Sequence, residues 1–594
     1  MLDRLETLRR QGAVEDVDVH FALLMTRLAG DSSDALTLGA LLASQSTTGG
    51  HVCVDLHKVA GRTVIDPGDD TPVIAPDAEM WMDGLRAASV VGSPGAHSPL
   101  VLDEAGRLYL YRYWQYEQRL SHNLLKRVEQ TTDDIGHEQL KANLERLFPA
   151  PENQGADWQK VAAAVAVLKR FCVISGGPGT GKTTTVARLL SLLLEQHPGT
   201  QPLRIALVAP TGKAAARLQE SLRSAKPALN TDAAIKDAIP EDASTIHRLL
   251  GVRRNSIHFR HGPDAPLPLD VLIVDEASMV DIALMTKLVE ALPASARLIL
   301  LGDRDQLASV EAGAVLGDIC EKGDGYSAEF AALLESLAGV SVSDKVAAGS
   351  DVQDAVVVLQ HSYRFGADSG IGNLANAVNA GDAMQSLQIL RDPAFADATF
   401  SPVASVREFE TAILEAAEAE FRRYFDAVAS DVAADEILET FARFRFLCAH
   451  RTGPYSARHI NQLITDWIKR RWRINSRSNW YPGRPVMIVR NDYNVRLFNG
   501  DIGVALPDST HEGRLRVFFQ SPDGGVRAFS PIRLPEHETV YAMTVHKSQG
   551  SEFDHVSLVL PENISNVSTR ELIYTGVTRA KRRVEIRGSE RVLN

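Results

Sequence analysis

Cysteine is scarce in this chain, and its four copies lie far apart. They stand at positions 53, 172, 320 and 448, and no C-x-x-C pair occurs. Structural zinc sites and disulfide frameworks need several cysteines at short, regular spacings, so the sequence argues against both. Scattered thiols of this kind are typical of proteins from a reducing cytoplasm.

Long apolar runs and an excess of positive charge are missing as well. No run approaches the length that spans a bilayer, and the beginning, MLDRLETLRRQG, lacks the apolar core of a signal peptide. We therefore expect a soluble, cytoplasmic protein without a membrane partner. Because the formal net charge is −12, any nucleic acid must be bound by local basic patches and not by the field of the whole molecule.

The 594 residues are enough for three or four domains, and the pattern of predicted elements changes along them. We interpret residues 1–110 as an N-terminal domain with helical patterns and 111–150 as a helical connector. Strand–helix alternation then indicates one parallel α/β unit over 151–353 and a second over 354–594. Within the second unit, NG, DG and GG turns between short β-like runs predict a β-rich insertion at about 482–535.

Buried parallel strands are predicted from short apolar runs that lie between helical patterns. In the first unit these runs are 172–175, 205–209, 271–274 and 298–301. In the second unit they are 356–359, 445–449, 541–545, 556–560 and 584–586. Two stretches rich in Ala, Asp and Ser, 221–243 and 321–353, are interpreted as loops or small insertions.

Residues 176–183 read GGPGTGKT and fit the pattern G-x-x-x-x-G-K-T. An apolar strand precedes the motif and a helical pattern at 183–196 follows it, so a Gly-rich turn that only caps a helix is the weaker interpretation. The glycines let backbone N–H groups turn toward a polyphosphate at the positive end of the helix. Lys182 can reach the β- and γ-phosphates of ATP, and the Thr183 hydroxyl can hold Mg²⁺. The residues predicted to bind ATP here are Gly176, Gly177, Pro178, Gly179, Thr180, Gly181, Lys182, Thr183 and Thr184.

Two carboxylates follow the apolar run LDVLIV, at Asp275 and Glu276. Ligands of parallel sheets bind at the carboxyl ends of the strands, where this pair stands. Asp275 suits Mg²⁺, held directly or through water, and Glu276 suits activation of the attacking water. Such a pair alone is often only a solvated helix start, but after a phosphate loop and in this strand order it indicates catalysis.

Three further side chains are candidates for contact with the γ-phosphate. Gln306 in GDRDQL follows the next strand and could sense hydrolysis, although a polar loop residue is the alternative. Arg364 in QHSYRF and Arg579 in YTGVTRAKRR lie far downstream, and a guanidinium can stabilise charge on the γ-phosphoryl oxygens. If both reach the nucleotide, ATP lies in a cleft between two sheets and hydrolysis is coupled to opening and closing. The alternative is a pair of surface arginines at helix starts.

Eight patterns in order resemble the motifs of superfamily 1 helicases and, among them, of the RecD family, the alpha subunit of the RecBCD enzyme. They span about residues 159–582 and read GGPGTGKT, VAPTGKAAARL, STIHRLL, VDEASMVD, GDRDQL, SYRF, TVHKSQGSEF and YTGVTRAKRR. HVCVDL at 51–56 and RLYLYRYWQYEQRL at 107–120 also resemble that family. The resemblance implies an α/β fold: two tandem RecA-like P-loop NTPase domains, a mainly helical N-terminal domain and a small β-rich insertion in the second motor domain. Longer stand-alone relatives carry an extra N-terminal helical DNA-binding region, for which we expect no room in this chain.

The resemblance also implies roles for individual residues near the nucleotide. Gln159 matches the glutamine that recognises adenine, with a helix-surface glutamine as the alternative. Gln549, Gly550 and Glu552 match the motif that lies near the nucleotide and the DNA track.

Single-stranded DNA contacts are implied for three short segments. Pro210, Thr211 and Lys213 resemble the first DNA-contacting motif, and their loop after a strand can donate to phosphate. Thr245 and His247, with Ser244, resemble the second motif. Helix capping is the alternative for Thr245, and both roles can hold together. The corresponding contacts on the second motor domain are Thr544, His546 and Lys547.

Basic and aromatic residues are interspersed between 443 and 484, with nine arginines and three tryptophans among them. A basic groove with aromatic faces suits single-stranded nucleic acid. A solvated helix face backed by core tryptophans explains the same pattern equally well.

Together these resemblances imply an ATP- and Mg²⁺-dependent 5′-to-3′ DNA helicase that assembles with RecB-like and RecC-like subunits on duplex DNA ends. We expect no nuclease centre in this chain, because Asp275 and Glu276 are assigned to ATP and no other acidic metal motif is visible. The N-terminal domain, which lacks visible chemistry, is the candidate docking surface. One alternative is a self-sufficient helicase. Another is a subunit that uses ATP only as a conformational switch, which the set Glu276, Gln306, Arg364 and Arg579 argues against.

Overall fold

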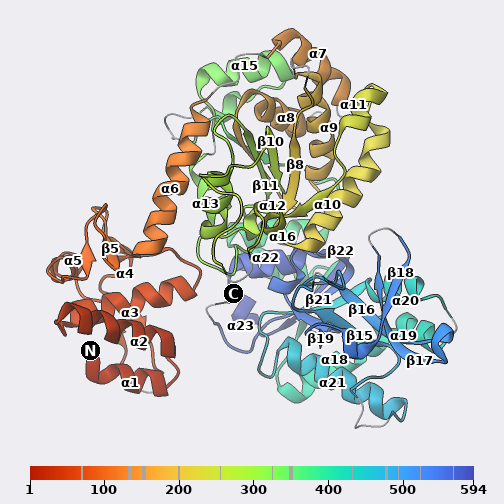
Figure 1. The fold of residues 1–594 in the computed structure, drawn as a ribbon. Helices are drawn as coiled ribbons and strands as arrows, with labels where there is room; N and C mark the ends of the chain where they lie inside the picture. The colour runs from red at the N-terminus through yellow and green to blue at the C-terminus, as the bar shows by residue number, and fades with distance from the viewer. Residues whose placement is uncertain are drawn as a thin grey trace.

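The computed structural model shows three parts that follow one another along the chain (Figure 1). It describes residues 1–594 apart from 69–70, 131–134, 150–155, 198–200, 254–255, 324, 347–348, 350–351, 431, 475–478, 493, 522–523, 566 and 594. The predicted boundary between connector and first motor unit, at 150–151, lies outside the described residues.

The N-terminal part packs helices against a small mixed sheet with strand order β1-β6-β5-β4. Its core gathers around α3, whose residues 36–44 are all buried because they are small or apolar on every side. The helices are α1 (Leu2–Arg10), α2 (Asp16–Ala29), α3 (Asp34–Thr48), α4 (Leu56–Val59) and α5 (Ala78–Arg86). The strands are β1 (Cys53–Asp55), β4 (Val91–Gly92), β5 (Leu100–Leu102) and β6 (Arg107–Leu110), beside the hairpin β2 (Thr63–Ile65) and β3 (Val73–Ile74).

The long helix α6 (Tyr111–Val128) leads from this part to the first motor domain (Figure 1). It packs along α13 (Ile282–Ala291), where Arg119 forms an ion pair with Glu290. The buried guanidinium of Arg127 donates to the carbonyls of Leu292 at 2.8 Å, Pro293 at 2.9 Å and Ala296 at 3.0 Å. One cation thus satisfies several main-chain acceptors just after α13 ends.

The first motor domain is built on a six-stranded, all-parallel sheet with strand order β12-β7-β11-β10-β8-β9. The strands are β7 (Phe171–Gly176), β8 (Ile205–Ala209), β9 (Ala243–Thr245), β10 (Val271–Val274), β11 (Arg297–Gly302) and β12 (Val356–Leu359). Helices α7 (His137–Leu147), α8 (Trp158–Leu168), α9 (Lys182–Glu195), α10 (Gly212–Ala225), α12 (Ile246–Leu250), α13 and α14 (Val315–Lys322) surround it. The four strands predicted for this sheet are confirmed, because their apolar runs are covered on both faces.

Two expectations about the first motor domain are wrong. The strand at 356–359 was expected in the second sheet, but β12 pairs with β7 at the edge of the first. The short apolar run VVVL does not indicate which of the two sheets the strand joins. For the stretches interpreted as loops or small insertions, the loop alternative is wrong, because they contain helices α11 (Ala233–Ala238) and α15 (Ala328–Ala338), and α15 buries Phe330, Leu334 and Leu337. Their polar composition reflects exposed faces, not missing helices.

The second motor domain holds a five-stranded parallel sheet, ordered β13-β22-β21-β14-β20. Its strands are β13 (Ala398–Pro402), β14 (Phe444–Cys448), β20 (Ala542–Thr544), β21 (Phe553–Val559) and β22 (Ala580–Gly588). Four of them were predicted, whereas β13 was missed because ATFSP lacks a continuous apolar run. The helices are α16 (Gly370–Ala380), α17 (Ala383–Arg391), α18 (Val406–Glu420), α19 (Arg422–Ala429), α20 (Ala434–Phe441), α21 (Ala457–Arg471), α22 (Arg570–Thr578) and α23 (Glu590–Leu593).

The predicted β-rich insertion is confirmed as an antiparallel sheet with order β18-β17-β16-β15-β19. Its strands are β15 (Arg484–Ile488), β16 (Ile502–Asp508), β17 (Arg514–Gln520), β18 (Val526–Phe529) and β19 (His537–Thr539). Val486, Ile488, Val517 and Phe519 form part of its own small core.

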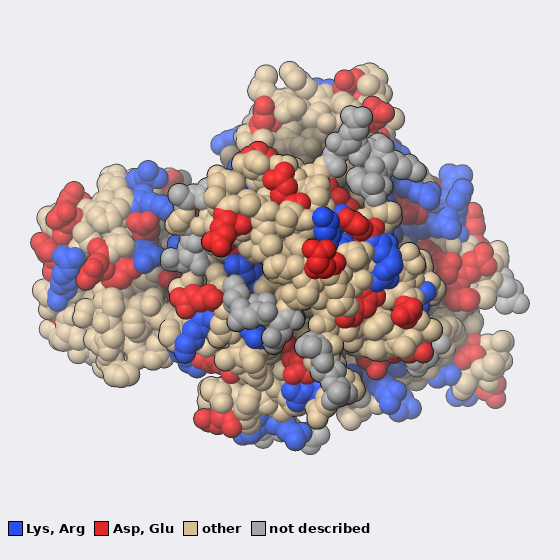
Figure 2. Space-filling model, turned by 90° about the horizontal axis from the view of Figure 1, so that it is seen from above, with Lys and Arg blue, Asp and Glu red and all other residues tan. Residues whose placement is uncertain are grey.

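The surface charges and the hydropathy of the helices agree with what the composition indicates. Positive and negative side chains are intermixed over the face shown in Figure 2. Among the described residues, none of the helices combines the length and the hydropathy needed to cross a bilayer.

Candidate active site

The phosphate loop curls around the side chain of Lys182, between the end of β7 and the start of α9. The Lys182 ammonium donates to the carbonyl oxygens of Gly176 and Gly177, the latter at 3.1 Å. Gly179 and Gly181 have φ of 78° and 80°, which residues with a Cβ rarely adopt. A Cβ on Gly181 would also collide with the Gln159 amide, and one on Gly179 with Arg364. The glycines of the motif are therefore required by both conformation and close packing.

Gln159 lies in the first turn of α8 and touches this loop directly. Its Nε2 donates to the Thr180 carbonyl at 3.0 Å, and its Oε1 accepts from Arg188 at 3.4 Å. The side chain is buried, so it is not a helix-surface glutamine. Its role toward adenine stays a prediction.

Asp275 and Glu276 follow β10, two strands from β7 in the sheet. Burial raises the pKa of Asp275, the neighbouring Glu276 charge adds to this, and Lys182 opposes it. Glu276 has φ of 51°, an uncommon conformation for a residue with a side chain, and its N–H donates to Asp275 Oδ1 at 2.9 Å. Backbone strain of this kind gathers at functional sites, where the surrounding fold holds it in place.

Asp303 is a buried carboxylate at the end of β11 that the sequence analysis passed over. Gln306 Nε2 donates to it at 2.9 Å, and the hydroxyl of Tyr574, from α22 of the second motor domain, donates at 3.0 Å. Burial raises the pKa of Asp303, while Lys182 and these hydrogen bonds oppose the rise. A Cβ on Gly177 would stand 3.0 Å from the same Tyr574 hydroxyl. Tyr574 of the second motor domain therefore packs against the phosphate loop of the first.

The loop that carries Gln306 is bound to the second motor domain through the next residue, Leu307, whose N–H and carbonyl groups both form hydrogen bonds. The Leu307 N–H donates to Thr575 Oγ1 at 2.8 Å, and Gln549 Nε2 donates to the Leu307 carbonyl at 2.8 Å. Any change in the spacing of the two domains must therefore move Gln306 relative to the phosphate loop.

Arg364 reaches the phosphate loop from the segment after β12. The preceding residues bond to the same loop: the Tyr363 N–H donates to the Gly179 carbonyl at 2.8 Å, and Ser362 Oγ donates to Pro178 at 3.2 Å. One guanidinium nitrogen of Arg364, Nη2, donates to Glu552 at 2.9 and 3.0 Å. The other, Nη1, is buried and has no hydrogen-bond partner among the described residues.

Arg579 is buried at the end of α22, where Nε donates to the Thr575 carbonyl at 3.2 Å. Burial lowers the pKa of Arg579, and the charges of Glu276 and Glu552 oppose the fall. Arg364 is half-buried against the phosphate loop and Arg579 is buried, so neither is simply a surface arginine. Only Arg579 comes from the second sheet's domain, because the strand before Arg364 joins the first sheet.

The candidate DNA contacts stand at the carboxyl ends of β8, β9 and β20. Thr211 caps α10 and Thr245 caps α12, so the capping interpretation of Thr245 holds. Lys213 Nζ donates to Ser551 Oγ of the second motor domain at 2.8 Å, and burial lowers the pKa of Lys213 to about 8. Lys547 forms an ion pair with Glu538 at 2.6 Å.

The remaining members of this set are partly enclosed. The His247 ring meets the edge of Phe259, and burial lowers the pKa of both His247 and His546. Pro210 precedes the Thr211 cap, and Thr544 Oγ1 accepts from the Lys547 N–H at 3.4 Å. Their contact with DNA stays a prediction.

The basic and aromatic stretch at 443–484 divides between core and surface. Arg445 is fully buried and lies 4.0 Å from the centre of the Phe441 ring. Tyr481 is buried, and Trp467 and Trp472 pack against the core of the second motor domain. For Arg445 and Tyr481 the core interpretation is confirmed, whereas Trp467 and Trp472 are only partly buried, so a contact of the rest of the stretch with DNA stays a prediction.

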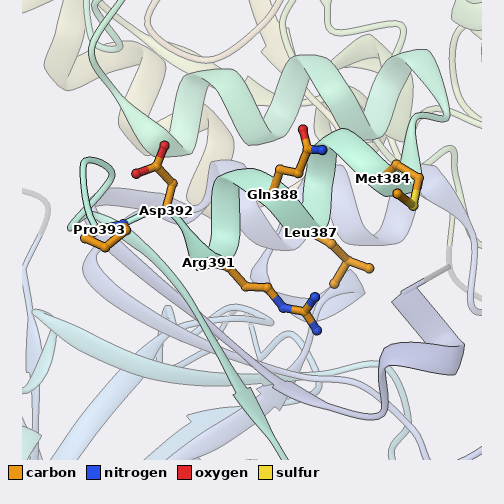
Figure 3. A pocket seen from close by; sticks show the side chains of 6 residues that line it. All are labelled: Met384, Leu387, Gln388, Arg391, Asp392 and Pro393. Atoms are coloured by element: carbon orange, nitrogen blue, oxygen red, sulfur yellow. The ribbon is translucent and has the colours of Figure 1, made fainter.

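An open hollow elsewhere on the surface contains none of the predicted site residues. It is lined by Met384, Leu387, Gln388, Arg391, Asp392 and Pro393 on and after α17 (Figure 3). Arg391 there pairs with Glu590 of α23. The hollow is therefore formed by the second motor domain and is separate in its lining from the candidate active site.

Three residues at the site were missed: Asp303, Tyr574 and Arg217. Each lies within a pattern that had been recognised, namely GDRDQL, YTGVTRAKRR and VAPTGKAAARL. A signal was thus available, because polar residues in such a motif tend to meet the same ligand or one another. Their partners, however, stand up to 335 positions away and only the fold pairs them.

A phosphate loop and a strand-end carboxylate pair, faced by Arg364 from the segment after β12 and by Arg579 from the second motor domain, define a two-domain motor ATPase of helicase superfamily 1. Three family models match the chain in order: "RecBCD enzyme subunit RecD, N-terminal domain" over residues 10–109, "AAA domain" over 159–312 and "UvrD-like helicase C-terminal domain" over 539–586. The chain belongs to the RecD family of RecBCD enzyme subunits.

Relatives cover nearly the whole chain. The RecBCD enzyme subunit RecD of Mycobacterium tuberculosis is 40% identical over 589 residues, which is 98% of this chain and 92% of the relative. The same subunit of Haemophilus influenzae is 40% identical and covers 100% and 96%. An ATP-dependent RecD2 DNA helicase of Deinococcus radiodurans is 30% identical and covers 83% and 57%. Among solved structures, Bacteroides Pif1 bound to ssDNA is 15% identical with a TM-score of 0.37, over 72% of this chain and 91% of that chain.

Proposed function

We propose that this protein is an ATP-dependent, 5′-to-3′ single-stranded DNA translocase and helicase. In this proposal it acts as a subunit of a RecBCD-like complex that unwinds and processes duplex DNA ends for recombinational repair. One observation carries the proposal: Arg364, Tyr574 and Gln549 meet the phosphate loop and the Gln306 loop from segments downstream of the first sheet, and Arg579 is buried near the charges of Glu276 and Asp303. Such a site is complete only when the two domains meet, so hydrolysis and domain motion are linked.

The chain's own residues can carry out phosphoryl transfer to water. Lys182 and the loop N–H groups hold the β- and γ-phosphates, and Gln159 stands where adenine is expected. Glu276 orients the attacking water and accepts its proton, while Gln306 reports the γ-phosphate to the second domain. Arg579 and Nη1 of Arg364 stabilise the charge that spreads over the γ-phosphoryl oxygens.

The residues beside the loop fit a magnesium ion. Asp275 is a half-buried carboxylate whose raised pKa marks a position where a cation is favoured, and Thr183 stands on α9 next to Lys182. Mg²⁺ is commonly held by one or two protein oxygens together with the phosphates of its nucleotide. When bound, it neutralises charge on the β- and γ-phosphates.

DNA is proposed to lie across the carboxyl ends of β8, β9 and β20, on both motor domains. Thr211, Lys213, Thr245 and His247 serve the first domain, and Thr544, His546 and Lys547 serve the second. Opening and closing of the cleft then shifts one set of contacts relative to the other, which moves the strand.

Assembly with RecB-like and RecC-like subunits is proposed to involve the N-terminal domain. Helix α2 supports this, because Val17, Leu24 and Leu28 expose 56%, 45% and 58% of their surface at helical spacing. An apolar stripe of this kind on an outer helix is typical of a protein–protein contact. Such an assembly would work in the cytoplasm, and any nuclease activity would belong to the complex.

The test combines a pull-down from native extract with unwinding of 5′- and 3′-tailed duplexes. We expect two larger partner subunits and unwinding from the 5′ tail only, and Lys182→Gln should abolish ATP hydrolysis without altering the fold. Processive unwinding by the isolated chain, without partners, would favour a self-sufficient helicase. Nucleotide binding without DNA-stimulated hydrolysis would favour a conformational switch.

A further inference from the structure

Glu552 gathers cations from both motor domains beside the catalytic site. Arg217 of α10 forms an ion pair with its carboxylate, Arg364 donates to it at 2.9 and 3.0 Å, and Lys581 of β22 lies 3.7 Å away. Burial alone would raise the pKa of Glu552, but the guanidinium groups of Arg217 and Arg364 hold it at about 2. The carboxylate is therefore always ionised, and charge-assisted bonds of this kind are among the stronger ones in proteins.

Arg217 connects this cluster with the edge where DNA is proposed to bind. It stands four residues after Lys213 on α10, so the two side chains lie on one face of the helix, a single turn apart. Burial lowers the pKa of Arg217, yet the carboxylates of Glu552, Glu276 and Asp275 raise it above its ordinary value overall. The side chain thus lies between the DNA-facing start of α10 and the catalytic carboxylates.

The opposite side of the cluster fixes the orientation of Arg364. Its Nη2 is held by Glu552, while Nη1 is buried without a hydrogen-bond partner among the described residues. A buried donor left unpaired is costly, so an oxygen acceptor at this position would be strongly favoured. A γ-phosphoryl oxygen held by the neighbouring phosphate loop is such an acceptor.

We propose that Arg217 is a positioning residue that couples DNA contact to ATP hydrolysis, because it orients Arg364 through Glu552 from a helix whose start meets DNA. A strand bound at Thr211 and Lys213 fixes α10, and the helix transmits that placement rigidly over one turn. Arg217 then holds Glu552, which in turn holds Arg364 with Nη1 toward the phosphate. This inference rests on the proposed function, since it requires hydrolysis that DNA stimulates.

The experiment measures steady-state ATP hydrolysis by the full-length chain, with and without saturating oligodeoxythymidine. For Arg217→Met we expect kcat with DNA to fall about tenfold, while KM for ATP and Kd for DNA change less than about threefold. Arg217→Lys, which keeps the charge but loses the planar fork, should recover part of the loss. Arg223→Met on the same helix is the matched control, because the ion pair of Arg223 within the described part of the chain is with the half-buried Glu241, away from Glu552, and the variant should behave as the unmutated chain.

A double-mutant cycle separates a relay from a merely structural role. If Arg217 acts through Glu552, Arg217→Met should cause no further loss of kcat in a Glu552→Gln background. Additive losses, or an unchanged DNA stimulation in Arg217→Met, would overturn the inference. If Arg217→Met fails to fold, Arg217→Lys decides in the same cycle. Absence of DNA-stimulated hydrolysis in the unmutated chain would instead overturn the proposed function itself.

Discussion

Tyr574 of the second motor domain donates its hydroxyl hydrogen to the buried carboxylate of Asp303 in the first, at 3.0 Å. The two residues are 271 positions apart, and the bond crosses the cleft directly beneath the phosphate loop. It joins the end of β11, which leads to Gln306, with the helix that ends at Arg579. The same contact therefore reports on domain closure and on the placement of two candidate catalytic groups.

Removal of this hydroxyl should weaken the closed cleft. In Tyr574→Phe the buried Asp303 carboxylate loses one hydrogen-bond donor. The loss destabilises each conformation that contains this hydrogen bond by about 1–3 kcal/mol. We expect kcat for ATP hydrolysis to fall roughly tenfold, with nucleotide affinity nearly unchanged, because the loss affects the closed state. The matched control is Tyr363→Phe, which changes an exposed tyrosine near the same loop. This variant should hydrolyse ATP at the normal rate. A normal rate in Tyr574→Phe would mean that the bond has no part in closure.

Arg579 should matter for hydrolysis far more than for binding. Its guanidinium is buried near Glu276, where the proposed mechanism places the charge that develops on the γ-phosphoryl group. For Arg579→Ala we expect a fall in kcat of about 10³-fold, with binding of a fluorescent ATP analogue retained. Equal loss of binding and turnover would assign Arg579 to the structure and not to the transition state. Thermal unfolding of the variant serves as the control for folding.

Lys213 predicts a pH dependence of DNA binding. Its pKa is lowered to about 8, so the amine is charged at pH 7 and loses its proton as the pH rises through 8. A DNA phosphate favours the charged form and raises this pKa, so binding at pH 8.5 to 9 must take up a proton. Calorimetry in two buffers of different ionisation enthalpy should detect this uptake, and Lys213→Met should abolish it. Equal proton uptake by both proteins would show that Lys213 does not meet phosphate.

Glu538 should compete with DNA for Lys547. Its carboxylate lies 2.6 Å from the Lys547 ammonium and 3.8 Å from Arg451, as a phosphate oxygen would in a complex. Glu538→Gln should therefore tighten binding of single-stranded DNA by about two- to tenfold at low salt, an effect that salt screens. Glu536→Gln removes the same charge two residues away from an exposed position and is the matched control. Equal tightening in both variants would reflect net charge alone.

The sequence predicted those parts of the site that depend on one short segment. GGPGTGKT between a strand and a helix, and Asp275-Glu276 after an apolar run, both reflect local backbone geometry, and the structure places them as expected. The strands followed in the same way, since a parallel strand covered on both faces is apolar throughout. The β-rich insertion was visible from its turns.

The rest depended on contacts that no local pattern carries. The run at 356–359 is equally apolar in either sheet, and only the pairing with β7 shows where it belongs. Arg445 looked like a surface cation, but its guanidinium is stacked inside the aromatic core, which composition cannot reveal. The ion cluster on Glu552 joins α10, the segment after β12 and β22, and it exists only because two domains meet.

The hydrogen bonds from Arg127 to three or more carbonyls attach the connector helix firmly to the first motor domain. Helix α6 is fixed to the first motor domain, which carries the phosphate loop. The Gly313 N–H of that domain also donates to the Gly50 carbonyl of the N-terminal domain at 3.0 Å. We therefore expect that a partner bound to the N-terminal domain would hold the first motor domain in place, and that any domain motion during ATP hydrolysis would displace the second motor domain.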